Sequence, residues 1–85
     1  MTKKARKDIY QDVKLAVMQI LDVSEDKVSI ETSFSADLNA DSLDIVEVLM
    51  KLEDKYGIEI PEEMARNLCT VKEMVDYIEQ RLQET

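Results

Sequence analysis

The sequence contains no histidine and no tryptophan, and it has only one residue each of cysteine, proline, glycine and phenylalanine. The lack of histidine removes the commonest general base and metal ligand. A single cysteine, Cys69, can form no internal disulfide and no thiolate cluster for zinc, and we expect it to be a small buried core residue. No apolar run is long enough to cross a membrane. These absences argue against metal chemistry and against a membrane-spanning chain.

Positive charge is outnumbered, because 11 Lys and Arg stand against 19 Asp and Glu, which gives the 85 residues a net charge of −8. An acidic chain repels nucleic acid and anionic membranes, so we expect no nucleic-acid partner and no stable membrane insertion, but partners with basic protein surfaces. The acid is concentrated in residues 41–63, which hold eight acidic residues against Lys51 and Lys55. The basic segment "MTKKARKD" is followed by no apolar stretch typical of a secretory signal, which favours a cytoplasmic protein.

Leu, Ile, Val, Met, Glu and Lys dominate what remains, which favours helices in one small domain. Helical spacing of apolar residues predicts a first helix over residues 4–21 and another helix at the end of the chain. Thr70 is expected to cap the last helix, with Glu73 three residues later as in a capping box. Residues 22–40 have no steady period, but their isolated apolar residues predict a long loop pinned to the core. The expected buried residues of the two helices are Ile9, Val13, Ala16, Val17 and Ile20, and Val71, Met74, Val75, Ile78 and Leu82.

The stretch "DSLDIVEVLMKLEDKYG" predicts a second helix that begins at Asp41 or Ser42 and ends near Tyr56. Asp41 is a good N-cap, Asp44 completes a capping box, and Gly57 is a typical C-cap residue. Pro61, followed by two glutamates, indicates a short third helix that ends near residue 68.

The second helix carries two apolar stripes instead of one. The first is the expected core stripe, formed by Ile45, Val48, Leu49, Leu52 and Tyr56. The second comprises Leu43, Val46 and Met50. One interpretation packs the second stripe against the long loop or the third helix. The other makes it a docking surface, because an apolar centre with a charged rim is common interface anatomy.

Ser42 stands at the first turn of this helix, between two acidic residues. It is no catalytic nucleophile, because no histidine and no Ser-x-x-Lys arrangement activates it. It could cap the helix, or it could carry a covalent phosphodiester, since helix N-termini favour anions.

A calcium loop is the third possibility for this segment, because Asp37, Asn39 and Asp41 alternate as its ligands do. The loop needs glycine at its sixth position and glutamate at its twelfth, where this chain has Ser42 and Val48. We therefore predict no metal site.

"DLNADSLD" and the acidic helix after it resemble the acyl carrier protein family, and the match covers almost the whole chain through "DVSEDKVSIETSF", "YGIEIPEE" and "TVKEMVDYI". The resemblance implies an all-α four-helix bundle, with three longer helices, a short third helix and a long loop between helices one and two. It implies one acyl carrier domain over residues 1–85. It also implies 4′-phosphopantetheine on Ser42, installed by a phosphopantetheinyl transferase, with the acyl group held as a thioester.

By the same resemblance, Asp41 and Leu43 flank the attachment site. Residues read by basic partner enzymes are Asp44, Val46, Glu47, Met50, Glu53 and Asp54. Residues that line the acyl chain are Ile45, Leu49, Leu52, Ile60 and Leu68. Three positions depart from the family: Asn39 replaces a usual glycine, while Lys51 and Arg66 weaken the negative field locally.

The resemblance implies a carrier and not an enzyme. The second apolar stripe is small and ringed by charge, which predicts a monomer. The first functional hypothesis is a carrier of growing acyl chains between enzymes of fatty acid biosynthesis. The second is a specialised carrier for a polyketide, amino-acyl or lipid-modification pathway. The third is an unmodified acidic helical adaptor, which leaves Ser42 unexplained.

Overall fold

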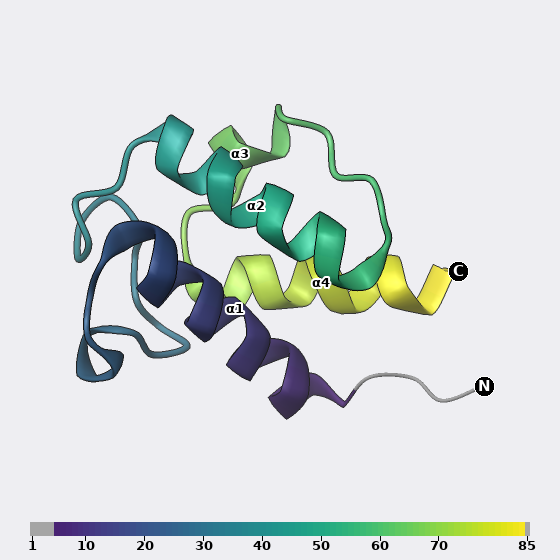
Figure 1. Ribbon diagram of the computed structural model, residues 1–85, viewed down its shortest axis with the longest axis horizontal. Coiled ribbons are helices and arrows are strands. Elements are labelled where there is room, and N and C mark those ends of the chain that lie inside the picture. Colours follow the sequence, from purple (N-terminus) through teal and green to yellow (C-terminus); the bar gives the residue numbers. More distant parts are fainter. Residues whose placement is uncertain (1–4, 85) are drawn as a thin grey trace.

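The computed structural model describes residues 5–84, which fold into four α-helices and no strand. The helices are α1 (Arg6–Leu21), α2 (Ser42–Tyr56), α3 (Met64–Asn67) and α4 (Val71–Glu84), and a 3₁₀ turn occupies Glu25–Lys27. Helix α1 packs against both α2 and α4, and α3 packs against α2 (Figure 1). This arrangement confirms the predicted all-α bundle with a short third helix. The predicted start of α1 at residue 4 lies outside the described residues.

The core is made by one face of each long helix. Ile9, Val13 and Val17 of α1 are fully buried, as the spacing predicted, while Ile20 is half-buried against them. The stripe on α4 is also confirmed, with Leu82 half-buried at its end. The fully buried residues of α4 are Val71, Met74, Val75 and Ile78. Burial of each such side chain stabilises the fold by about 1.5–3 kcal/mol.

The long loop wraps the end of the bundle where α1 stops and α2 starts (Figure 1). Val28 and Phe34 insert into the core, with Phe34 only 1% exposed. The loop also satisfies backbone groups at the start of α4, because the N–H groups of Val71 and Lys72 donate to the carbonyls of Thr32 (3.0 Å) and Ile30 (2.9 Å). The first N–H groups of a helix have no partner inside it. The prediction of a loop pinned to the core is therefore confirmed.

Helix α3 is shorter than predicted, because it begins at Met64 and not at Pro61. The N–H groups of Met64, Ala65 and Arg66 donate to carbonyls three residues earlier, so Pro61 starts a tight turn that leads into the helix. Proline favoured the backbone angle for such a turn but did not establish the α-helical hydrogen-bond pattern. The predicted end near residue 68 is confirmed, since the helix ends at Asn67.

The far end of α2 is fixed by its C-cap and by contacts with α1. Gly57 adopts a left-handed backbone with φ 65°, and its N–H donates to the carbonyl of Glu53, as predicted. The hydroxyl of Tyr56 donates to the carboxylate of Asp12 on α1, and Lys55 lies 3.7 Å from the same carboxylate. Burial and the hydrogen bond to Asp12 raise the pKa of Tyr56. These contacts join α2 to α1 at the end remote from Ser42.

Candidate functional site

The N-terminus of α2 is closed by the predicted capping box. The carboxylate of Asp41 accepts the N–H of Asp44 at 3.0 Å, and the carboxylate of Asp44 accepts the N–H of Asp41 at 3.2 Å. Asp41 is therefore the N-cap residue, and Ser42 is the first residue of the helix. The interpretation of Ser42 as the cap is wrong, because Asp41 already performs that role.

The hydroxyl of Ser42 is exposed and has no hydrogen-bond partner among residues 5–84. The backbone N–H groups of Ser42 and Leu43 likewise have no acceptor in that range. Such N–H groups at a helix start favour a negatively charged group. The structure therefore presents a hydroxyl open to modification at a position suited to a phosphate.

The turn before Ser42 depends on two local features. Asn39 has φ 56°, a left-handed conformation that asparagine tolerates better than most residues. The next residue, Ala40, is buried, and its N–H donates to the carbonyl of Phe34 at 2.9 Å. Asn39 thus supplies the left-handed residue of this turn, at the position where the family usually has glycine. Because Phe34 is a core residue, this hydrogen bond ties the start of α2 to the interior.

The second apolar stripe is split between surface and interior. Leu43 is 71% exposed and Met50 is 55% exposed, whereas Val46 is half-buried and packs on the core. The packing interpretation is thus correct for Val46 alone. Two large apolar side chains therefore remain on the surface of α2, Leu43 next to Ser42 and Met50 farther along the helix, which is what the docking interpretation requires.

The carboxylates around this stripe are not equivalent. Glu47 and Asp54 are exposed, and neither has a side-chain partner within residues 5–84. Asp44 is engaged in the capping box, and the carboxylate of Glu53 accepts the N–H of Ile60. Asp44 and Glu53 therefore hold the fold together as well as contributing negative charge, a role that the spacing along the helix could not reveal for Glu53.

A pocket of about 170 Å³ lies beside Ser42, between the long loop, α2 and α3. Of the residues expected to line an acyl chain, Ile45 and Leu68 line this pocket. Leu49 is buried in the core, and Ile60 lines a separate hollow near Glu59. The full lining comprises Phe34, Ser35, Ala40, Asp41, Ser42, Ile45, Ala65, Arg66, Leu68 and Cys69.

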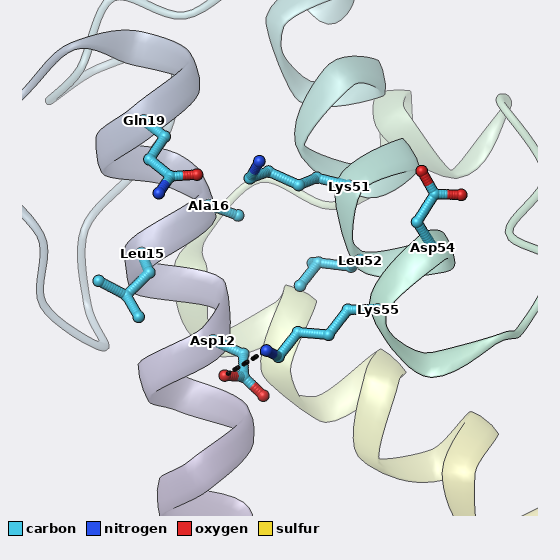
Figure 2. A pocket seen from close by; sticks show the side chains of 8 residues that line it. All are labelled: Asp12, Leu15, Ala16, Gln19, Lys51, Leu52, Asp54 and Lys55. Atoms are coloured by element: carbon cyan, nitrogen blue, oxygen red, sulfur yellow. Dashed lines mark ion pairs between the residues drawn. The ribbon is translucent and has the colours of Figure 1, made fainter.

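Leu52 lines a different and larger pocket, of about 460 Å³, between α1 and α2 (Figure 2). In this view Lys51 extends from α2 toward α1, while Asp54 points away from α1. Lys51 has no ion-pair partner in the described part of the chain. Ser42 does not line this pocket, so the pocket is separate from the site around Ser42.

The prediction that Cys69 is a core residue is wrong, because its side chain is exposed. Its neighbour Leu68 is buried, and the backbone carbonyl of Cys69 accepts the N–H of Phe34 at 2.9 Å. This extended pairing between the loop and the segment before α4 sends neighbouring side chains to opposite sides. An apolar context without a period could not indicate which side Cys69 would take.

Two negative findings concern residues 5–84. No group of three or more His, Cys, Asp or Glu side chains is placed to hold a metal ion. None of the helices in this range combines the length and the apolar character that crossing a membrane requires.

Comparison with known proteins gives a consistent match. The family described as "Phosphopantetheine attachment site" matches residues 11–78. The chain is 50% identical over 72 residues to the acyl carrier protein of Helicobacter hepaticus, covering 85% of this chain and 95% of that protein. It is 48% identical over 71 residues to the acyl carrier protein of Wolinella succinogenes, with 84% and 93% covered. It is 47% identical over 75 residues to that of Thermosynechococcus vestitus, with 88% and 93% covered.

Proposed function

Because the chain belongs to the acyl carrier protein family, we propose that Ser42 carries 4′-phosphopantetheine and that the protein shuttles acyl groups on this arm. The observation that supports Ser42 most strongly is its exposed hydroxyl, which has no partner in residues 5–84 beside a helix start already capped by Asp41. The bound arm supplies the thiol that holds the acyl group as a thioester.

The residues around Ser42 suit this group chemically. A phosphodiester on its hydroxyl would lie near the N–H groups of Ser42 and Leu43, at the positive end of the helix dipole. Ile45 and Leu68 offer apolar surface in the adjacent pocket. We propose that a guest chain enters there and reaches Leu49, Leu52 and Ile60 by displacing core side chains.

We propose that partner enzymes bind an acidic docking surface, formed by Asp44, Val46, Glu47, Met50, Glu53 and Asp54, with Asp41 and Leu43 beside Ser42. Leu43 and Met50 give it an exposed apolar centre, and Glu47 and Asp54 give it exposed negative charge. Electrostatic steering accelerates encounter with basic surfaces without requiring a large buried area. That combination suits a carrier that must bind several enzymes and leave each of them quickly.

The pathway that this docking surface suits best is fatty acid biosynthesis, in which the protein would act as a carrier and not as a catalyst. Residues 1–85 would then form one acyl carrier domain, working as a cytoplasmic monomer with a phosphopantetheinyl transferase and synthase enzymes. A specialised carrier is the second candidate. Lys51 and Arg66 favour this second candidate, because they reduce the negative charge available to enzymes with basic docking surfaces.

The attachment is tested by incubating the purified protein with coenzyme A and a phosphopantetheinyl transferase, followed by intact mass spectrometry. The expected result is a mass gain of one phosphopantetheine for the wild type and none for Ser42→Ala. Ser42→Ala removes only the hydroxyl of a residue that caps nothing, so the variant is expected to fold normally. Equal labelling of both proteins would overturn the assignment of Ser42.

The docking surface is tested with Glu47→Lys, because the Glu47 side chain has no partner in the part of the chain that the structure describes. Its matched control is Glu31→Lys, the same charge reversal on the exposed surface of the long loop. At low salt we expect the KM for the transferase to rise about 5-fold for Glu47→Lys, the factor given by a surface ion pair of about 1 kcal/mol. The control should match the wild type. An equal effect of both variants would point to net charge and reject a specific surface.

A further inference from the structure

Arg66 lies on the wall between two pockets that both include Ser42. The first is the pocket of about 170 Å³ described above. The second, of about 330 Å³, lies on the other side and is also lined by Leu43 and Val46. Ser42, Ala65 and Arg66 are the residues that the two pockets share. Arg66 and Ser42 thus border the same two pockets.

Arg66 is also the one arginine of the described residues that has no partner. Arg6 pairs with Asp76 at 2.7 Å and with Glu79 at 3.0 Å. Arg81 donates to the hydroxyl of Tyr77 at 2.9 Å and to a backbone carbonyl. Arg66 forms no ion pair or hydrogen bond through its side chain within residues 5–84.

Carboxylates are present near Arg66, yet none of them pairs with it. Glu62 and Glu63 line the second pocket and Asp41 lines the first. Asp41 is already engaged in the capping box with Asp44. These carboxylates attract the exposed guanidinium of Arg66 without fixing its orientation. The guanidinium therefore remains available for a stronger, directional partner.

A phosphodiester is such a partner. The planar guanidinium can donate two parallel hydrogen bonds to the two unesterified oxygens of a phosphate, which an ammonium group cannot match in geometry. We propose that Arg66 is the counter-ion of the phosphodiester on Ser42 and positions the first part of the arm. This inference rests on the proposed attachment at Ser42, and it adds a role for a residue of α3.

The pairing would have a structural consequence for α3. This helix has only four residues, and its main packing partner among the helices is α2. A hydrogen-bonded bridge from Arg66 to the phosphate would join α3 to the first turn of α2. Attachment of the arm would therefore slow the local opening of α3, and the effect would fall as salt screens the pair.

The test compares the unmodified and the enzymatically modified wild-type protein, both labelled with ¹⁵N, by nuclear magnetic resonance. The side-chain Nε–H resonances of Arg66, Arg6 and Arg81 are followed, so the two engaged arginines serve as internal controls. On modification we expect the Arg66 resonance to shift and its hydrogen exchange to slow about 2- to 5-fold, as an exposed charge pair supports. Those of Arg6 and Arg81 should stay unchanged.

Variants supply a second readout, the ³¹P resonance of the attached phosphate. Modified Arg66→Gln should differ from the wild type at low salt, Arg66→Lys should show part of the change, and Lys51→Gln should match the wild type. Lys51→Gln is the matched control, because it also removes one unpaired positive charge. An Arg66 side-chain resonance that does not respond in fully modified wild-type protein would overturn the inference. A wild-type protein that gains no mass would instead overturn the proposed function.

Discussion

The capping box at the start of α2 allows a quantitative test of how the attachment residue is positioned. Asp41→Ala removes the carboxylate that accepts the N–H of Asp44, and it also removes a negative charge from the first turn. Asp41→Asn keeps an oxygen acceptor of the same reach but loses the charge. The two variants therefore separate the hydrogen bond from the electrostatic effect.

The expected losses follow from the two contributions. Replacing an N-cap residue by alanine typically costs about 1 kcal/mol. An exposed charge beside the helix dipole contributes about 0.5 kcal/mol at low salt. Asp41→Ala should therefore destabilise the protein by about 1.5 kcal/mol in total. Asp41→Asn should cost only about 0.5 kcal/mol, a loss that salt removes.

Thermal unfolding followed by circular dichroism measures both values. For a domain of 85 residues, 1 kcal/mol corresponds to a change in Tm of about 4–8 °C. Asp41→Ala should thus melt clearly below Asp41→Asn at every salt concentration. Equal melting temperatures for the two variants in high salt would show that the hydrogen bond from Asp44 contributes nothing, and would refute the capping argument.

Three further predictions concern the frame around the site. Phe34→Ala empties a fully buried position in the long loop and should cost about 3–5 kcal/mol in urea unfolding, whereas a loss below about 1 kcal/mol would contradict the pinned loop. Gly57→Ala should lower the free energy of unfolding by about 1–2 kcal/mol through the left-handed backbone alone, because nothing lies within 4 Å of the added methyl. Gly57→Asn should lower it less, because asparagine tolerates this conformation better, and the reverse order would be inconsistent with a backbone cause. Burial and Asp12 raise the pKa of Tyr56 above the value of about 10 in the unfolded chain, so this tyrosine's stabilising contribution is complete below pH 10 and is lost as the pH rises toward the folded pKa. Tyr56→Phe should therefore lose less stability than the wild type between neutral and alkaline pH, as measured by urea unfolding, and an equal loss in both proteins would exclude Tyr56 as its source.

Local sequence signals predicted the parts of the fold that depend on neighbouring residues. The capping boxes of Asp41 with Asp44 and of Thr70 with Glu73 follow from a spacing of three residues, and both are present in the structure. Gly57 likewise ends α2 because a left-handed residue is needed at that point. Such features are set by a few consecutive dihedral angles, so the sequence contains the information directly.

Features that depend on segments distant in the sequence were not predictable in the same way. The partner of Glu53 is the backbone of Ile60, seven residues away across a turn. The exposure of Cys69 follows from pairing with Phe34 in the long loop. Arg66 appeared in the sequence only as an unusual charge, and its position between two pockets beside Ser42 required the packing of α3 on α2.

The most direct test of the account is the mass of the protein isolated from the cells that make it, followed by fragmentation of the peptide that contains Ser42. This peptide should be heavier by one phosphopantetheine, with the added group located on the Ser42 oxygen. A native population in which that peptide always has its unmodified mass would contradict the proposed carrier function.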